Sequence, residues 1–187
     1  MTLPIAQLGQ PILRRETSPL TPDELMSPEF QAFVQAMRET LQEAGGVGLA
    51  APQVFSEHRI FLARVGAPGP DGEPPPAELF INPTILAASE ERVARWEGCL
   101  SFPELLVLVP RWRQIRLQYV DESGQTIERD LMDFPARVVQ HEYDHLEGIL
   151  TIDRAESTLH IIKASEAEAV FGSRSRSEPE SQEPTED

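Results

Sequence analysis

The segment PARVVQHEYDHLEG, residues 135–148, carries the strongest local signals in this sequence. Pro135 suits the first turn of a helix, because the amide proton that it lacks would have no partner there. Gly148 suits the position just after a helix, where a left-handed backbone is common. The segment therefore predicts a helix over residues 136–147.

Two histidines and a glutamate make this helix chemically distinctive. Residues four apart lie on the same side of a helix, so His141 and His145 can both reach one metal ion, and Glu142 lies beside the first of them. This HExxH arrangement is typical of hydrolytic metal sites. The alternative interpretation is an exposed polar helix face with ordinary contacts between histidine and glutamate.

A third metal ligand is needed, because catalytic sites of this kind usually combine three protein ligands with a water. The sequence offers two solutions. Glu166 or Glu168 lies downstream at the spacing found in zincin metalloproteases. The other solution is Cys99, the only cysteine, although a lone cysteine is also often a small buried apolar residue.

The rest of the chain predicts one further clear helix and several strands. Apolar residues recur on one helical face over residues 28–43, and Ser27 is a suitable cap. The other predicted elements are strands at 59–65, 78–86 and 94–102, β-structure over 105–134 with a turn at 121–124, and a weaker helix at 156–170. This order predicts one α+β domain with antiparallel strands packed around a central helix that carries the HExxH motif.

Length, charge and hydropathy exclude several classes of protein. A chain of 187 residues with 40% apolar residues fits one domain, and its net charge of −15 argues against direct binding to nucleic acid. No apolar run is long enough for a membrane span, and the N-terminus lacks a secretion signal, so a cytoplasmic protein is predicted. Residues 172–187 are rich in serine, proline and glutamate and predict an acidic disordered tail.

Three motifs in fixed order give the sequence a family resemblance. They are GVGLAAPQ at 46–53, EGCLS at 97–101 and HEYDHLEG at 141–148. Together they resemble the motifs of the peptide deformylases, and the resemblance extends over roughly residues 5–154. It implies that residues 1–171 form a peptide deformylase-like catalytic domain, which removes the formyl group from N-formylmethionyl nascent peptides and releases formate.

The resemblance also implies a metal site. Cys99, His141 and His145 would bind one divalent metal ion, Fe²⁺ in the cell, with Ni²⁺, Co²⁺ or Zn²⁺ as substitutes. A thiolate and two imidazoles suit these metals better than magnesium or calcium. Hydroxide on the metal would attack the formyl carbonyl, with Glu142 as general acid and base.

Further residues acquire roles from the same resemblance. The side chain of Gln53 and the backbone N–H of Leu100 would stabilise the developing negative charge on the formyl oxygen. Glycines would let the backbone approach the peptide, and apolar side chains would form the methionine pocket. The glycines are Gly46, Gly48 and Gly98, and the apolar residues are Val47, Phe134 and Val138.

The sequence departs from the family at two places. The EGCLS motif is followed by Phe102-Pro103-Glu104 and then by the apolar residues 105–109, which leaves contacts beyond the first substrate residue open. The acidic C-terminus does not support ribosome docking through a basic C-terminal helix. A catalytically silent, deformylase-like binding protein is a further alternative, although the intact Glu142 and Gln53 argue against it.

Overall fold

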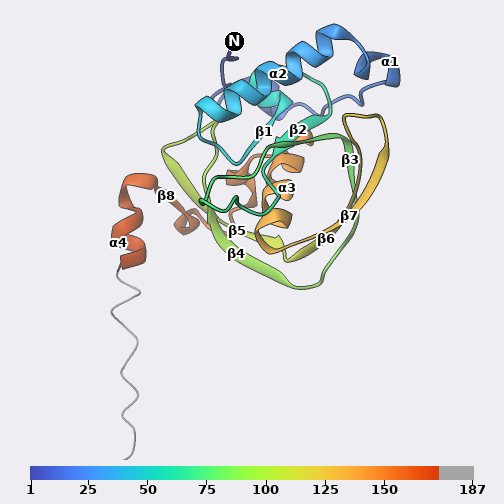
Figure 1. The fold of residues 1–187 in the computed structure, drawn as a ribbon. Coiled ribbons are helices and arrows are strands. Elements are labelled where there is room, and N and C mark those ends of the chain that lie inside the picture. Colours follow the sequence, from blue (N-terminus) through green and yellow to red (C-terminus); the bar gives the residue numbers. More distant parts are fainter. Residues whose placement is uncertain (173–187) are drawn as a thin grey trace, which may run out of the picture.

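The computed structural model describes residues 1–172, which form helices, 3₁₀ turns and strands (Figure 1). The helices are α1 (Pro22–Leu25), α2 (Pro28–Glu43), α3 (Asp133–Leu146) and α4 (Ala167–Gly172). The strands are β1 (Gly48–Ala50), β2 (Ile60–Ala63), β3 (Glu78–Ala88), β4 (Arg92–Glu97), β5 (Leu105–Trp112), β6 (Gln114–Val120), β7 (Thr126–Met132) and β8 (Ile161–Lys163).

The strands form two antiparallel sheets, which confirms the α+β prediction. The larger sheet has the order β1-β2-β3-β6-β7 and the smaller sheet the order β4-β5-β8. The predicted turn at 121–124 joins β6 and β7 into a hairpin, where Gly124 has a φ of 81° and the Asp121 amide donates to the Gln125 carbonyl at 2.9 Å.

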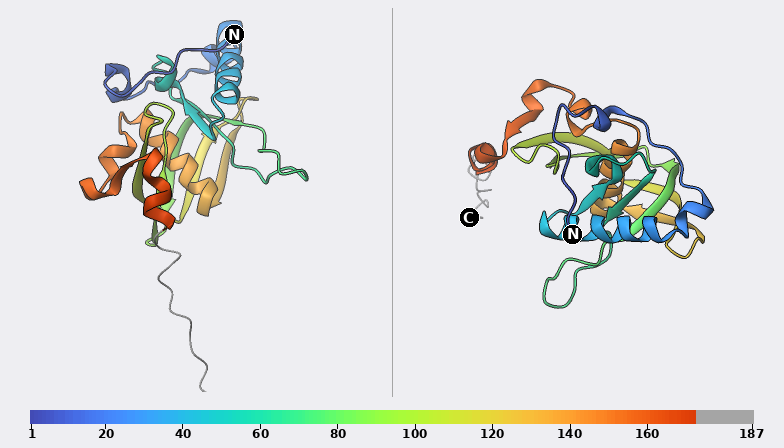
Figure 2. Two further views of the ribbon diagram at one scale, coloured as in Figure 1. Left: turned by 90° about the vertical axis from the view of Figure 1, so that its left-hand side faces the viewer. Right: turned by 90° about the horizontal axis from the view of Figure 1, so that it is seen from above.

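Helix α2 has the predicted bounds and buries the predicted face. Ser27 caps it by accepting a hydrogen bond from the Phe30 amide at 3.1 Å, and Gly45 follows it with a φ of 64°. Side chains alternate across β2, so Ile60 and Leu62 pack with the α2 cluster while Phe61 packs with the α3 cluster. The larger sheet is therefore covered by α2 on one face and by α3 on the other (Figure 2).

Helix α3 contacts strands of both sheets, including β1, β2 and β7 of the larger sheet and β5 of the smaller. It begins at Asp133 rather than at residue 136, so Pro135 occupies the third helical position, where its missing N–H still costs no intrahelical bond. Gly148 follows its end with a φ of 68°, and a β-carbon there would lie 2.7 Å from the Arg14 carbonyl oxygen. Both constraints require glycine at this position.

Two predicted elements were wrong. The strand expected at 94–102 ends at Glu97, and residues 98–102 form turns that carry the cysteine. The helix expected at 156–170 is replaced by the 3₁₀ turn Thr158–His160, strand β8, the 3₁₀ turn Ala164–Glu166 and the short α4. The β-branched Ile161 and Ile162 pair instead with the open edge of β5, a tertiary contact that helical periodicity does not reveal.

Gly172, the first residue of the predicted tail, is the last residue of α4. The remainder of the predicted disordered tail, residues 173–187, lies outside the described residues. Within residues 1–172, no helix is long and apolar enough to cross a membrane.

Candidate metal centre and its pocket

Three predicted ligands converge although they come from separate parts of the chain. Helix α3 provides His141 and His145, and the turn after β4 provides Cys99. Their ligand atoms all lie within 4.8 Å of one another, and Cys99 Sγ lies 3.3 Å from His145 Nε2. One sulfur and two imidazoles at this spacing fit a borderline-soft divalent metal ion.

The zincin alternative is wrong for this fold. Glu166 ends a 3₁₀ turn and Glu168 lies in α4, and neither belongs to the group of converging ligand atoms. Within residues 1–172, the group of Cys99, His141 and His145 is the one set of three that could hold a metal ion.

A buried carboxylate orients the first histidine. Glu97 Oε2 lies 3.0 Å from His141 Nδ1, so this nitrogen can donate to Glu97 while Nε2 remains available on the cysteine side. Burial raises the pKa of Glu97, but hydrogen bonds from His141 and Arg111 outweigh it and lower the pKa from 4.5 to about 2. The charged form therefore stabilises the fold above about pH 4.5, and this contribution is lost as pH falls through about 2.

Three arginines, from β5, from α3 and from the 3₁₀ turn Thr151–Arg154, complete a network that the sequence did not reveal. Arg111 donates to Glu97 at 2.9 and 3.1 Å and to Asp144 at 2.5 Å. Arg137 also contacts Glu97, and Arg154 donates to Asp144. Arg111 and Arg154 both lie within the span that resembles the family, but no sequence pattern predicted a partner for either of them.

We expect Arg111→Met to destabilise the fold by about 3 kcal/mol. This is the low end of the usual cost of breaking a buried ion pair, because Arg137 and Arg154 still contact the two carboxylates. The matched control is Arg113→Met, whose side chain is 45% exposed and pairs with surface carboxylates, so a loss below about 1 kcal/mol is expected. Urea unfolding at pH 7 measures both, and equal losses would contradict the expectation.

The carboxylate of Glu142 is buried at the same place. The residue is 3% exposed, and its Oε2 has no hydrogen-bond partner within the described part of the chain. Burial raises its pKa to about 7, against the lowering effect of the His141 and Arg111 charges. A carboxyl group with such a pKa exchanges protons near neutral pH, as a general acid or base requires.

Gly48 in β1 leaves the space that this carboxylate occupies. A β-carbon at Gly48 would lie 2.2 Å from Glu142 Oε1 and 2.6 Å from its Cδ. We expect Gly48→Ala to displace the carboxylate, keep the metal ligands intact and lower turnover roughly a hundredfold, as a displacement of about 1 Å can. Gly69→Ala is the control, since its β-carbon would meet Glu73 at an ordinary 3.6 Å. Near-normal turnover with Gly48→Ala would contradict the expectation.

Gln53 is buried with its amide directed at the cysteine loop. Its Oε1 accepts from the Ala50 amide at 2.9 Å, which fixes the orientation of the amide group. Its Nε2 then faces Ser101 Oγ at 3.2 Å and Cys99 Sγ at 3.6 Å. The predicted donor Leu100 lies between those two residues of the loop and lines the same pocket.

The N-terminal segment contacts the backbone on both sides of the two predicted donors, an arrangement that the sequence did not predict. The Ala6 amide donates to the Gln53 carbonyl and the Leu8 amide to the Ser101 carbonyl, each at 2.8 Å. Between them, Gln7 Nε2 donates to the Leu100 carbonyl at 3.2 Å. These residues lie at the start of the span that resembles the family, roughly residues 5–154, but only the fold brings them beside the cysteine loop.

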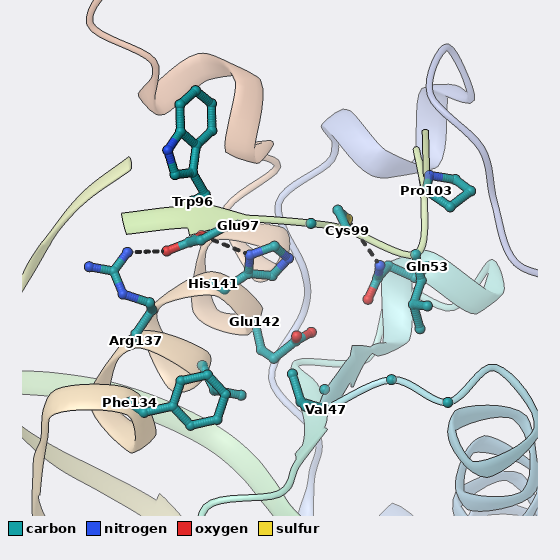
Figure 3. A pocket seen from close by; sticks show the side chains of 16 residues that line it. Val47, Gln53, Trp96, Glu97, Cys99, Pro103, Phe134, Arg137, His141 and Glu142 are labelled. Carbon is teal, nitrogen blue, oxygen red and sulfur yellow. Dashed lines mark hydrogen bonds and ion pairs between the residues drawn. The ribbon is translucent and has the colours of Figure 1, made fainter. Parts of the chain in front are cut away.

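Apart from His145, every predicted site residue lines one pocket of about 400 Å³ (Figure 3). Of the predicted methionine contacts, Val47 and Phe134 are exposed and Val138 is buried. Gly46, Gly48 and Gly98 all border this space. The sequence did not predict Trp96, Pro103 or Arg137, which line the same pocket.

Known proteins resemble this chain in sequence and in fold. Residues 2–160 match the family model described as polypeptide deformylase. The chain is 40% identical over 166 residues to peptide deformylase 2 of Nostoc sp., across 88% of this chain and 92% of that protein. It is 41% identical over 155 residues to the peptide deformylase of Thermotoga neapolitana, across 82% and 87%.

Solved structures of peptide deformylases have a fold similar to that of this chain. The Met-Ala-Ser-bound class I type b peptide deformylase from Acinetobacter baumannii superposes with a TM-score of 0.76 and 38% identity, covering 82% of this chain and 98% of that one. The peptide deformylase from Thermotoga maritima gives a TM-score of 0.75 and 38% identity, covering 84% and 99%. With most of its length matched in sequence and in fold, the chain belongs to the peptide deformylase family.

Proposed function

We propose that this chain hydrolyses the N-terminal formyl group of N-formylmethionyl nascent peptides and releases formate. The observation that carries the proposal is the convergence of Cys99, His141 and His145 beside the buried carboxylate of Glu142, whose Oε2 has no hydrogen-bond partner within residues 1–172. This arrangement supplies three metal ligands and a separate proton-transfer group, as metal-assisted amide hydrolysis requires.

The ligand set suits a ferrous ion in the cell, with nickel, cobalt or zinc as substitutes. A metal ion held there would lower the pKa of a bound water and so supply a nucleophile near neutral pH. The burial of Cys99 and His145 supports tight coordination, and the contact between Glu97 and His141 fixes the first imidazole. Strands of both sheets pack around α3, so we propose it as the central catalytic helix.

Glu142 transfers the proton in this proposal. It takes a proton from the attacking water as the new C–O bond forms on the formyl carbon, and it delivers a proton to the amine nitrogen as the C–N bond breaks. Gln53 Nε2 and the Leu100 N–H are the proposed donors to the formyl oxygen while negative charge builds on it. The hydrogen bond from Ala50 to Gln53 supports this role, because it turns the NH₂ group towards the cysteine loop.

The pocket accounts for recognition of the first residue. Val47, Phe134 and Val138 offer apolar surface for a methionine side chain. Gly46, Gly48 and Gly98 let the peptide backbone approach and pair as an added strand. We assign these functions to a catalytic domain of residues 1–171 in the cytoplasm, with no role for the acidic residues 172–187 in the chemistry.

Hydrolysis of formyl-Met-Ala-Ser tests the proposal against the silent binding protein. The purified chain should release one formate for each free amine, and acetyl-Met-Ala-Ser should remain intact, because its additional methyl group crowds the reacting carbon. Actinonin, which is bound in a structure of the A. baumannii relative, should inhibit. Binding of the formyl peptide without formate release would support the silent protein instead.

A further inference from the structure

The outer face of the smaller sheet is apolar and only half covered. Trp96 on β4 lies opposite Leu108 on β5, and Leu106 lies opposite Ile162 on β8. All four are half-buried, whereas Val107 and Val109 on the other face are buried in the core. Trp96 and Glu97 leave β4 on opposite sides, so Trp96 belongs to the outer face (Figure 3).

Helix α4 lies against this outer face. The Phe171 ring contacts the Trp96 ring with centroids 5.6 Å apart and an interplanar angle of 57°. Phe171 is still 38% exposed, so the contact leaves apolar surface open. Both β8 and α4 follow residue 160, where the match to the family model ends, and α4 lies far from α2 (Figure 2).

The outer face is continuous with the active-site pocket through Trp96. This residue lines the pocket together with Gly98 and Pro103. Gly98 adjoins the same face, because a β-carbon there would lie 3.6 Å from Leu106 Cδ2. A peptide leaving the pocket over Gly98 therefore passes the side of Trp96 and Leu106.

The side chains of an extended peptide point alternately to opposite sides. If the methionine side chain enters the pocket, one of the next two side chains is directed towards the outer face. We propose that Trp96, Leu106 and Phe171 form a subsite for an aromatic or large aliphatic side chain in the two residues after formylmethionine. The C-terminal helix then sets a sequence preference. This inference rests on the proposed function and names the substrate class of the same site.

Competing peptides test the subsite. We compare kcat/KM for formyl-Met-Phe-Ser and formyl-Met-Ala-Phe with that for formyl-Met-Ala-Ser. The full chain should favour at least one aromatic peptide, and Phe171→Ala should lower this preference by about three- to tenfold, the usual value of an aromatic contact. Phe171→Leu should restore part of it. Trp96→Ala should abolish it.

Two controls separate the subsite from general effects. Leu159→Ala alters another apolar side chain beyond the pocket, 84% exposed, and should keep the wild-type preference. Truncation after Gly172 keeps α4 and should do the same. If Phe171→Ala lowered kcat/KM equally for all three peptides, or left the preference for the aromatic peptide unchanged, the subsite would be overturned. A full chain that hydrolyses none of the peptides would overturn the proposed function, and the subsite with it.

Discussion

Cys99→Ala should lose both the bound metal ion and turnover. The sulfur is one of three ligand atoms within 4.8 Å, and alanine leaves two imidazoles, which is one ligand fewer than catalytic sites of this kind use. The protein should still fold, because Cys99 is a small member of a core cluster that also contains Leu13, Val107 and Leu150. Metal analysis after gel filtration, with kinetics on formyl-Met-Ala-Ser, measures the two losses together.

The control for Cys99→Ala is Ser101→Ala in the same loop. Ser101 is buried and contacts Gln53, but it contributes no atom to the ligand group, so its variant should retain the metal ion. One full metal equivalent and normal turnover in Cys99→Ala would contradict the assignment of the third ligand.

Glu142→Gln should show the opposite combination, with the metal ion retained and turnover nearly lost. Glutamine has nearly the same size as glutamate, so it fits the space that Gly48 leaves. The substitution removes the carboxylate that transfers the proton. General acid and base groups contribute roughly a hundred- to ten-thousandfold, so kcat should fall by such a factor. KM should change little, because the methionine pocket is lined by other residues.

The matched control is Glu147→Gln at the end of the same helix. Its carboxylate pairs with Arg59 on the far side from the metal ligands, so turnover should be near normal. A Glu142→Gln enzyme with a near-normal rate would remove Glu142 from the mechanism and leave the metal site unaffected.

Local signals predicted helices α2 and α3, and α3 carries two of the three predicted metal ligands. The apolar spacing and caps of residues 28–43 fix α2, and the HExxH spacing places His141 and His145 on one side of α3. Spacing alone did not single out Cys99, because Glu166 and Glu168 were also possible as the third metal ligand. Only the EGCLS motif distinguished them, since the contact between this turn and α3 joins distant parts of the chain.

Contacts between distant segments explain the errors and omissions. Asp144 reads as one more polar residue of a helix, yet the fold buries it between Arg111 and Arg154. Gln7 is exposed near the N-terminus, and nothing in its local sequence indicates that it contacts the Leu100 carbonyl. The isoleucines of β8 form a strand because β5 offers an open edge, a fact that is absent from their local sequence.

Formate release as a function of metal loading tests the central claim most directly. The chain is stripped of metal, then titrated anaerobically with Fe²⁺ while formate release from formyl-Met-Ala-Ser is followed. We expect no release without metal, a rate that rises in proportion to bound iron, and a plateau at one equivalent per chain. Full activity in the stripped protein, or no formate with one equivalent bound, would contradict this expectation.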